Sequence, residues 1–103
     1  MDREDSYDFE WDPVKALSNA RKHDVAFDLA ATVFSDALAL TIYDEAHSQN
    51  EERWFTMGFD SSGRLLAVAH TYQSAGQSGA GVRIISARKA TKHERRLYEE
   101  EPR

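Results

Sequence analysis

The chain of 103 residues contains no cysteine and only two prolines. Without cysteine it has no disulfide framework and no thiolate nucleophile, and the absence fits a reducing compartment. No apolar run approaches the ~20 residues that a membrane-spanning helix needs. The acidic N-terminus also lacks the apolar region of a secretory signal. We therefore expect a single cytoplasmic domain with no membrane association.

Several well-known functional motifs are also absent. The chain has no GxxxxGK[ST], GxGxxG or GxSxG, so nucleotide-cofactor and serine-hydrolase functions lack support. Its four histidines show no metal-ligand spacing such as HExxH. We expect neither a metal site nor a cofactor.

Positive charge is present but unevenly placed. The formal net charge is −5, yet residues 53–96 carry eight Lys/Arg against two acids, whereas residues 1–52 carry four against thirteen. The most concentrated segment, residues 82–98, is typical of a buried strand, a basic turn and a capped helix. Because the two parts of the chain carry net charges of opposite sign, we expect the basic part to form a surface that binds a polyanion.

Apolar spacing predicts the order strand, helix, helix, strands, helix. We expect a strand at 7–11, a helix that begins at Asp12-Pro13, and a second helix over 27–34. Strands follow at 38–43, 53–59, 64–71 and 82–87, with a turn at 60–63 and a mobile loop over 73–81. Thr91 and Glu94 match a capping box for the last helix.

Strands joined by short turns favour an antiparallel sheet with the helices segregated to one side, which is an α+β fold. Two predicted helices, the first beginning at Asp12-Pro13 and the second at residue 27, precede the run of strands, and one helix follows it. We expect residues 1–7 to be a disordered acidic N-terminus and residues 8–101 to form one domain.

Four arginines are candidates for binding phosphate, because a guanidinium offers a fork that matches phosphate oxygens. We expect Arg53, Arg64, Arg83 and Arg88 to line one exposed concave sheet face. Strict alternation places Arg83 and Arg88 on opposite faces, and the sequence leaves open which face is concave. Two alternatives also stay open: Arg83 pairs with an acid such as Asp60 or Glu10, and Arg64 is a solvated turn residue.

Other polar side chains have both structural and chemical interpretations. His70 lies in an apolar strand and is either a satisfied core histidine or a general base. His23 follows Lys22 at a helix C-terminus, where a cation complements the helix dipole. Trp54 either packs in the core or stacks on unpaired bases beside the arginines.

Several segments together resemble the BrnT family. The most specific are FEWDP at 9–13 with RKH at 21–23, and RIISARKAT..ER..Y over 83–98; the similarity spans about residues 9–98. Two positions depart from the family pattern. Asp24 replaces the usual glycine after RKH, and Ala26 replaces the usual serine at a helix cap. Losing a cap typically costs about 1 kcal/mol.

The resemblance implies a RelE-like fold and a toxin of a bacterial type II toxin–antitoxin system. It implies a metal-independent endoribonuclease that cleaves RNA by attack of the 2′-hydroxyl and inhibits translation and growth. It also implies a BrnA-like antitoxin, and contact with operator DNA only through that antitoxin. The oligomeric state stays open between a homodimer and a heterotetramer. The expected catalytic residues are Arg64, Arg83, His70, His23 and Lys22. The expected RNA-binding residues are Arg53, Arg88, Lys89 and Trp54.

In this scheme Arg64 and Arg83 clamp the reacting phosphate, and His70 or His23 exchanges protons. The alternative is a non-enzymatic interaction protein, either a decayed toxin or a co-repressor. Its basic surface would dock an acidic antitoxin chain.

Overall fold

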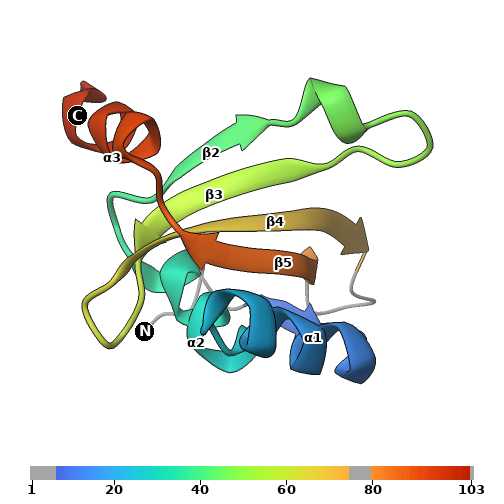
Figure 1. Cartoon of the computed structure of the whole chain (residues 1–103). Helices are drawn as coiled ribbons and strands as arrows, with labels where there is room; N and C mark the ends of the chain where they lie inside the picture. The colour runs from blue at the N-terminus through green and yellow to red at the C-terminus, as the bar shows by residue number, and fades with distance from the viewer. Residues whose placement is uncertain (1–6, 75–79, 103) are drawn as a thin grey trace.

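One five-stranded mixed sheet organises the chain (Figure 1). The computed structural model describes residues 7–74 and 80–102. The sheet has the order β1-β5-β4-β3-β2. Its strands are β1 Asp8–Glu10, β2 Leu40–Tyr43, β3 Trp54–Phe59, β4 Leu65–Ser74 and β5 Ala80–Lys89.

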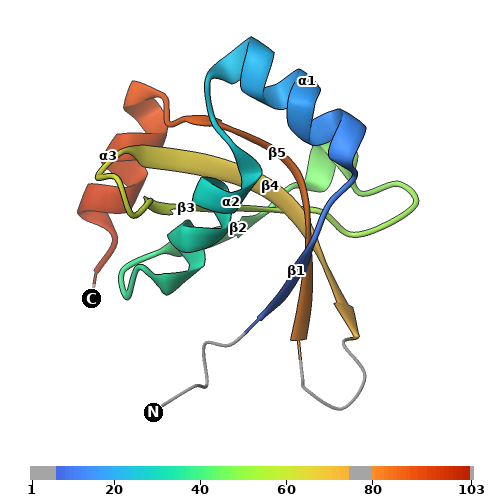
Figure 2. The same cartoon turned by 90° about the horizontal axis from the view of Figure 1, so that it is seen from below.

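Strands β2 to β5 are antiparallel neighbours, but β1 pairs parallel with β5 (Figure 2). The predicted antiparallel sheet is therefore wrong at this edge. A long stretch of chain separates β1 from β5, so no hairpin turn dictates the relative direction of the two strands.

The helices are α1 Pro13–His23, α2 Phe27–Ala31 and α3 Lys92–Glu100, with short 3₁₀ turns η1 Thr32–Ser35 and η2 Glu45–His47. Both N-terminal helices lie below the sheet in Figure 1, whereas α3 lies above it. The expected segregation to one side is wrong for α3. Tyr98 packs edge-on against Phe59, with ring centroids 5.6 Å apart, and Phe59 points away from α2.

Local signals placed the helix ends correctly. The Val14 backbone N–H donates to Asp12 Oδ1 at 2.8 Å, with Pro13 in the first turn. Asp24 ends α1 in the left-handed region at φ 59°, a conformation that glycine adopts more readily. Ala26 supplies no side-chain cap to α2. The predicted second helix is thus a short α2 that tightens into η1.

The predicted 73–81 loop is shorter than expected. Gln73 pairs with Gly81, so β4 and β5 extend into it, and residues 75–79 lie outside the described residues. Residues 1–6 of the expected disordered N-terminus also lie outside them. Tyr7 is described, and its ring packs against Phe34 at 5.7 Å.

The core lies between the sheet and the two N-terminal helices. Its fully buried members from the strands and from the α2–η1 segment are Leu66, Val68, Val82, Ile84, Ala87, Phe27, Ala30 and Val33. Each large side chain buried in this way contributes roughly 1.5–3 kcal/mol. The two N-terminal helices therefore cover only one side of the sheet, the side that faces α2. We call the opposite side of the sheet the open face.

Candidate nucleic-acid interface

A β-bulge in β5 decides which arginines reach the open face. Ala69 pairs with Ser86 but His70 pairs with Ile84, so Ile85 has no partner in the register. One extra residue reverses the alternation. Arg83 and Arg88 therefore share the open face, and the expectation from strict alternation is wrong.

A row of residues crosses the sheet on this face. Glu10 pairs with Arg83, and Arg83 with Thr71. Because Trp54 pairs with His70, the same register carried back one residue places Arg53 opposite Thr71. Adjacent strands lie about 4.8 Å apart, so the Arg53 and Arg83 backbones are about 10 Å apart. The two arginines therefore lie on either side of Thr71, on the same face of the sheet.

On β4, the residues that share the open face with Thr71 also have short side chains. Ala67 and Ala69 follow Thr71 at every second position and share its face. Thr71 is fully buried, and its Oγ1 has no hydrogen-bond partner among the described residues. Long side chains from β3 and β5 therefore flank a floor of short ones.

The three open-face arginines differ in how firmly they are held. Arg83 Nη1 lies 2.8 Å from Glu10 Oε2, but both side chains are about half exposed, at 42% and 52%. Such a surface pair contributes only ~0–1 kcal/mol and can exchange for a phosphate. Arg53 makes no ion pair with any residue that the structure describes.

Arg88 is held more tightly. Its guanidinium donates to both Glu94 carboxylate oxygens, at 2.7 and 2.9 Å, and lies 5.8 Å from the centre of the Phe55 ring. These hydrogen bonds hold the pKa of Glu94 below its usual value. Glu94 Oε1 also accepts from the Thr91 N–H, and Thr91 Oγ1 accepts from the Glu94 N–H, so the predicted capping box is confirmed. Arg88 thus ties α3 to the open face.

A small cavity of about 190 Å³ borders this face between α1 and β5. It brings together Lys22 and His23, which the sequence indicated, with Ser86, which lies one row from Arg83 on the open face. Its full lining is Lys15, Ser18, Asn19, Lys22, His23, Ile85 and Ser86. Sequence reasoning missed Lys15 and Ser18 as site residues. Their spacing with Lys22, at i, i+3 and i+7, was the available signal.

Arg64 lies away from the other arginines. Its Nη1 donates to the Asp24 carbonyl at 2.9 Å, and its Nε lies 3.4 Å from Asp60 Oδ2. Arg64 precedes Leu65 at the start of β4, seven residues from Thr71, which is about 23 Å of strand. The expected clamp of Arg64 with Arg83 is therefore wrong, and Arg64 holds a turn to the end of α1.

His70 is a core residue. It is 0% exposed, and its Nε2 lies 2.7 Å from Thr56 Oγ1. The rings of Phe34 and Tyr72 pack edge-on against it, at 4.9 and 5.0 Å. Burial lowers its pKa from 6.5 to about 4. The general-base interpretation of His70 is thus wrong: the ring has no contact with water and lies on the side opposite the arginines.

Trp54 and Lys89 also lie outside the open face. The half-buried Trp54 packs against Tyr43 and Tyr72, at 5.0 and 5.9 Å, on the same side of the sheet as His70. Its expected stacking beside the arginines is therefore not available. Lys89 ends β5 and lines a separate cavity of about 350 Å³ with Arg64 and Arg95.

Two absences hold for the part of the chain that the structure describes. Within residues 7–74 and 80–102, no three His, Asp or Glu side chains lie close enough to hold a metal ion. None of the helices in those ranges is long and apolar enough to cross a bilayer.

Comparison with known proteins identifies a family and a solved structure of similar fold. Residues 11–94 match the family model described as ribonuclease toxin, BrnT, of type II toxin–antitoxin system. The 1.1 Å crystal structure of the Brucella abortus ribonuclease toxin BrnT is similar in fold. Its TM-score is 0.60 at 21% identity, over 84% of this chain and 100% of that one. Comparison with curated protein sequences gives no match.

Proposed function

Because the chain belongs to the BrnT family of ribonuclease toxins of type II toxin–antitoxin systems, we propose that it cleaves RNA on its open face without a metal ion. The observation that supports this placement is the row Arg53–Thr71–Arg83, in which two arginines flank a short side chain. The chain is acidic overall, so this local positive charge must attract the polyanion.

The chemistry uses the RNA's own 2′-hydroxyl as nucleophile. Its oxygen forms a bond to the adjacent phosphorus while the bond to the 5′-oxygen breaks, which leaves a 2′,3′-cyclic phosphate and a 5′-hydroxyl. This step needs a fixed in-line geometry and positive charge where the phosphorane forms. Arg53 and Arg83 supply the charge at the reacting phosphate. Arg88, about 13 Å further along β5 and bound to Glu94, adds positive charge further along the RNA strand.

Two proton transfers accompany the displacement. One group takes the 2′-hydroxyl proton and another protonates the leaving 5′-oxygen. His23 and Lys22 are the candidates, because both line the cavity that opens beside Ser86. The buried His70 has no part in this scheme.

The family implies an antitoxin partner. We propose that this partner is BrnA-like, that it mediates any contact with operator DNA, and that the free toxin inhibits translation in the cytoplasm. A RelE-like ancestry of the fold is part of the same proposal.

One observation favours the non-enzymatic alternative. Arg83 and Arg88, both on the open face, each pair with a carboxylate of their own chain. A basic face already occupied by acids is suited to exchanging them for the acids of a partner protein.

Purified full-length protein incubated with total RNA and EDTA distinguishes these functions. We expect fragments that end in a 2′,3′-cyclic phosphate, and a loss of at least about 100-fold in rate for the Arg53→Gln, Arg83→Gln double variant. Lys92→Gln, on the exposed surface of α3, is the matched control and should cleave normally. Unchanged cleavage by the double variant would reject the clamp. Harmless high expression in a bacterium together with no cleavage would establish the docking role.

A further inference from the structure

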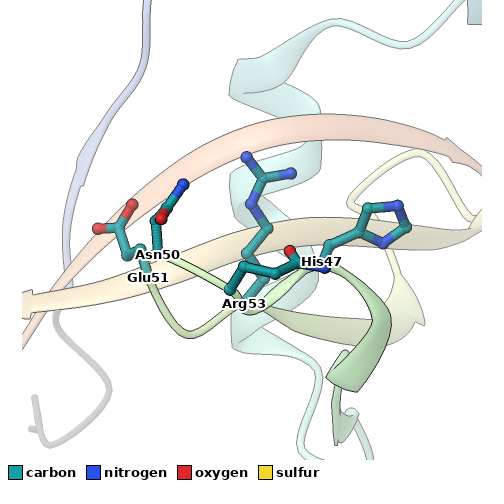
Figure 3. A pocket seen from close by; sticks show the side chains of 5 residues that line it. His47, Asn50, Glu51 and Arg53 are labelled. Carbon is teal, nitrogen blue, oxygen red and sulfur yellow. The ribbon is translucent and has the colours of Figure 1, made fainter.

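The connection between β2 and β3 forms a polar pocket at the end of the sheet (Figure 3). Its volume is about 330 Å³, within the range of ligand-binding pockets. Figure 3 shows the Arg53 side chain between the His47 ring and the side chains of Asn50 and Glu51. Gln49 completes the lining.

Hydrogen bonds hold this connection in one conformation. Ser48 Oγ donates to the Asp44 carbonyl at 2.6 Å and accepts from the Arg53 N–H at 3.0 Å. The Asp44 N–H donates to the Arg53 carbonyl at 2.9 Å, and His47 Nδ1 lies 3.0 Å from Asp44 Oδ2. The pocket is therefore formed before any ligand arrives, which lowers the entropic cost of binding.

We propose that this pocket is a base-reading subsite that selects guanine in single-stranded RNA, next to the phosphate that Arg53 contacts. The inference rests on the proposed function. Arg53 belongs both to the pocket and to the row that flanks Thr71, so a nucleotide whose phosphate lies on that row has its base within reach of the pocket.

The two acceptor oxygens that Glu51 offers in the pocket distinguish guanine from the other bases. The Glu51 carboxylate has two acceptor oxygens and no donor. Guanine alone presents two adjacent donors on its Watson–Crick edge, N1–H and the 2-amino group. Adenine and cytosine each place an acceptor beside their one amino group, and uracil places its single N–H between two carbonyls. Unpaired bases in single strands expose this edge to side chains.

Other lining groups complete the recognition. The Asn50 amide carries both donors and an acceptor, so its NH₂ can donate to guanine O6. The Gln49 Nε2 already donates to the Ala46 carbonyl at 3.0 Å, which fixes that side chain at the pocket wall. Glu51 is thus the residue on which the choice of base depends.

Two measurements test the subsite. The first sequences the cut sites in a random single-stranded RNA library. The second measures fluorescence anisotropy of a short oligonucleotide that is 2′-deoxy throughout, so that it cannot be cleaved, and that carries either guanine or inosine. Inosine lacks the 2-amino group.

We expect guanine at one fixed position relative to the cut, and about tenfold weaker binding of the inosine oligonucleotide. Glu51→Gln should still cleave, but without the preference and with equal binding of both oligonucleotides. Glu52→Gln, the adjacent exposed carboxylate outside the pocket, should behave as the unmodified chain.

A preference that survives Glu51→Gln, or no base preference at all, would overturn the subsite while leaving the ribonuclease proposal intact. If the guanine and inosine oligonucleotides bind with different affinities but no RNA is cleaved, only the ribonuclease proposal is overturned. Failure of every RNA and oligonucleotide to be cut or bound would overturn both.

Discussion

The Asn19 side chain bonds both backbone groups of Ala87, donating to its carbonyl at 2.8 Å and accepting from its N–H at 3.1 Å. Strand β1 pairs with β5 only as far as Arg83, so within residues 7–74 and 80–102 no strand pairs with the edge of β5 beyond that residue. The Asn19 side-chain amide makes the hydrogen bonds to Ala87 that a neighbouring strand would otherwise make. It also fixes α1, with Lys22 and His23, against the edge of β5.

Replacing Asn19 with alanine should destabilise the fold by about 2–3 kcal/mol, because it leaves buried backbone groups of Ala87 and Val25 without partners. Urea unfolding measures this change. Ser18→Ala, one residue earlier and exposed, is the control and should change stability by less than about 0.5 kcal/mol. Equal stabilities of the two variants would mean that the Asn19 bonds contribute nothing.

The Glu10–Arg83 pair permits a matched test of the open face. Glu10→Gln should tighten binding of single-stranded RNA about twofold to threefold, since it removes a competitor and a negative charge, and Arg83→Gln should weaken it about tenfold. The pair is exposed, so neither change should move unfolding stability by more than about 1 kcal/mol. Anisotropy titrations at two salt concentrations measure the effect. An Arg83→Gln protein that binds with the same affinity and salt dependence would remove Arg83 from the interface.

Glu94 should matter more to stability than Glu99 on the same helix. Glu94 binds the Arg88 fork and the Thr91 N–H, and its side chain is 19% exposed. Glu99 only approaches Arg95 at 3.6 Å and is 58% exposed. We expect Glu94→Gln to cost about 1–3 kcal/mol and Glu99→Gln less than about 0.5 kcal/mol. A larger cost at Glu99 in thermal or urea unfolding would contradict this assignment.

Features set by neighbours in sequence could be predicted. The Asp12 cap, the Thr91–Glu94 capping box and the alternating strands depend on contacts within a few residues, and the structure confirms them. The family resemblance rests on similar local segments, and the family match over residues 11–94 confirms it.

Features set by distant partners could not be predicted. The parallel β1–β5 pair and the unpaired Ile85 depend on register across the sheet, and the bulge alone moved Arg88 to the face of Arg83. Likewise, nothing near Arg64 in sequence shows that its guanidinium reaches the Asp24 carbonyl. Which of the predicted arginines share a face is therefore decided by register across the sheet, and the sequence did not reveal that register.

The buried His70 should make folding stability depend on pH. Its pKa is about 4 in the folded chain against 6.5 for an unperturbed histidine. Below pH 6.5 the unfolded chain binds a proton that the folded chain excludes, so stability falls as pH falls, until both states are protonated below pH 4. Between pH 8 and pH 5 the free energy of unfolding should drop by about 2 kcal/mol from this group.

Urea unfolding from pH 8 to pH 5 measures this slope above the range in which most carboxylates titrate. His70→Gln can keep a bond to Thr56 Oγ1 and has no proton to gain, so its stability should be nearly flat over that range. His93→Gln, exposed on α3, should keep the slope of the unmodified chain. If His70→Gln retains the full slope, the proton is taken up elsewhere and burial of His70 is not the cause.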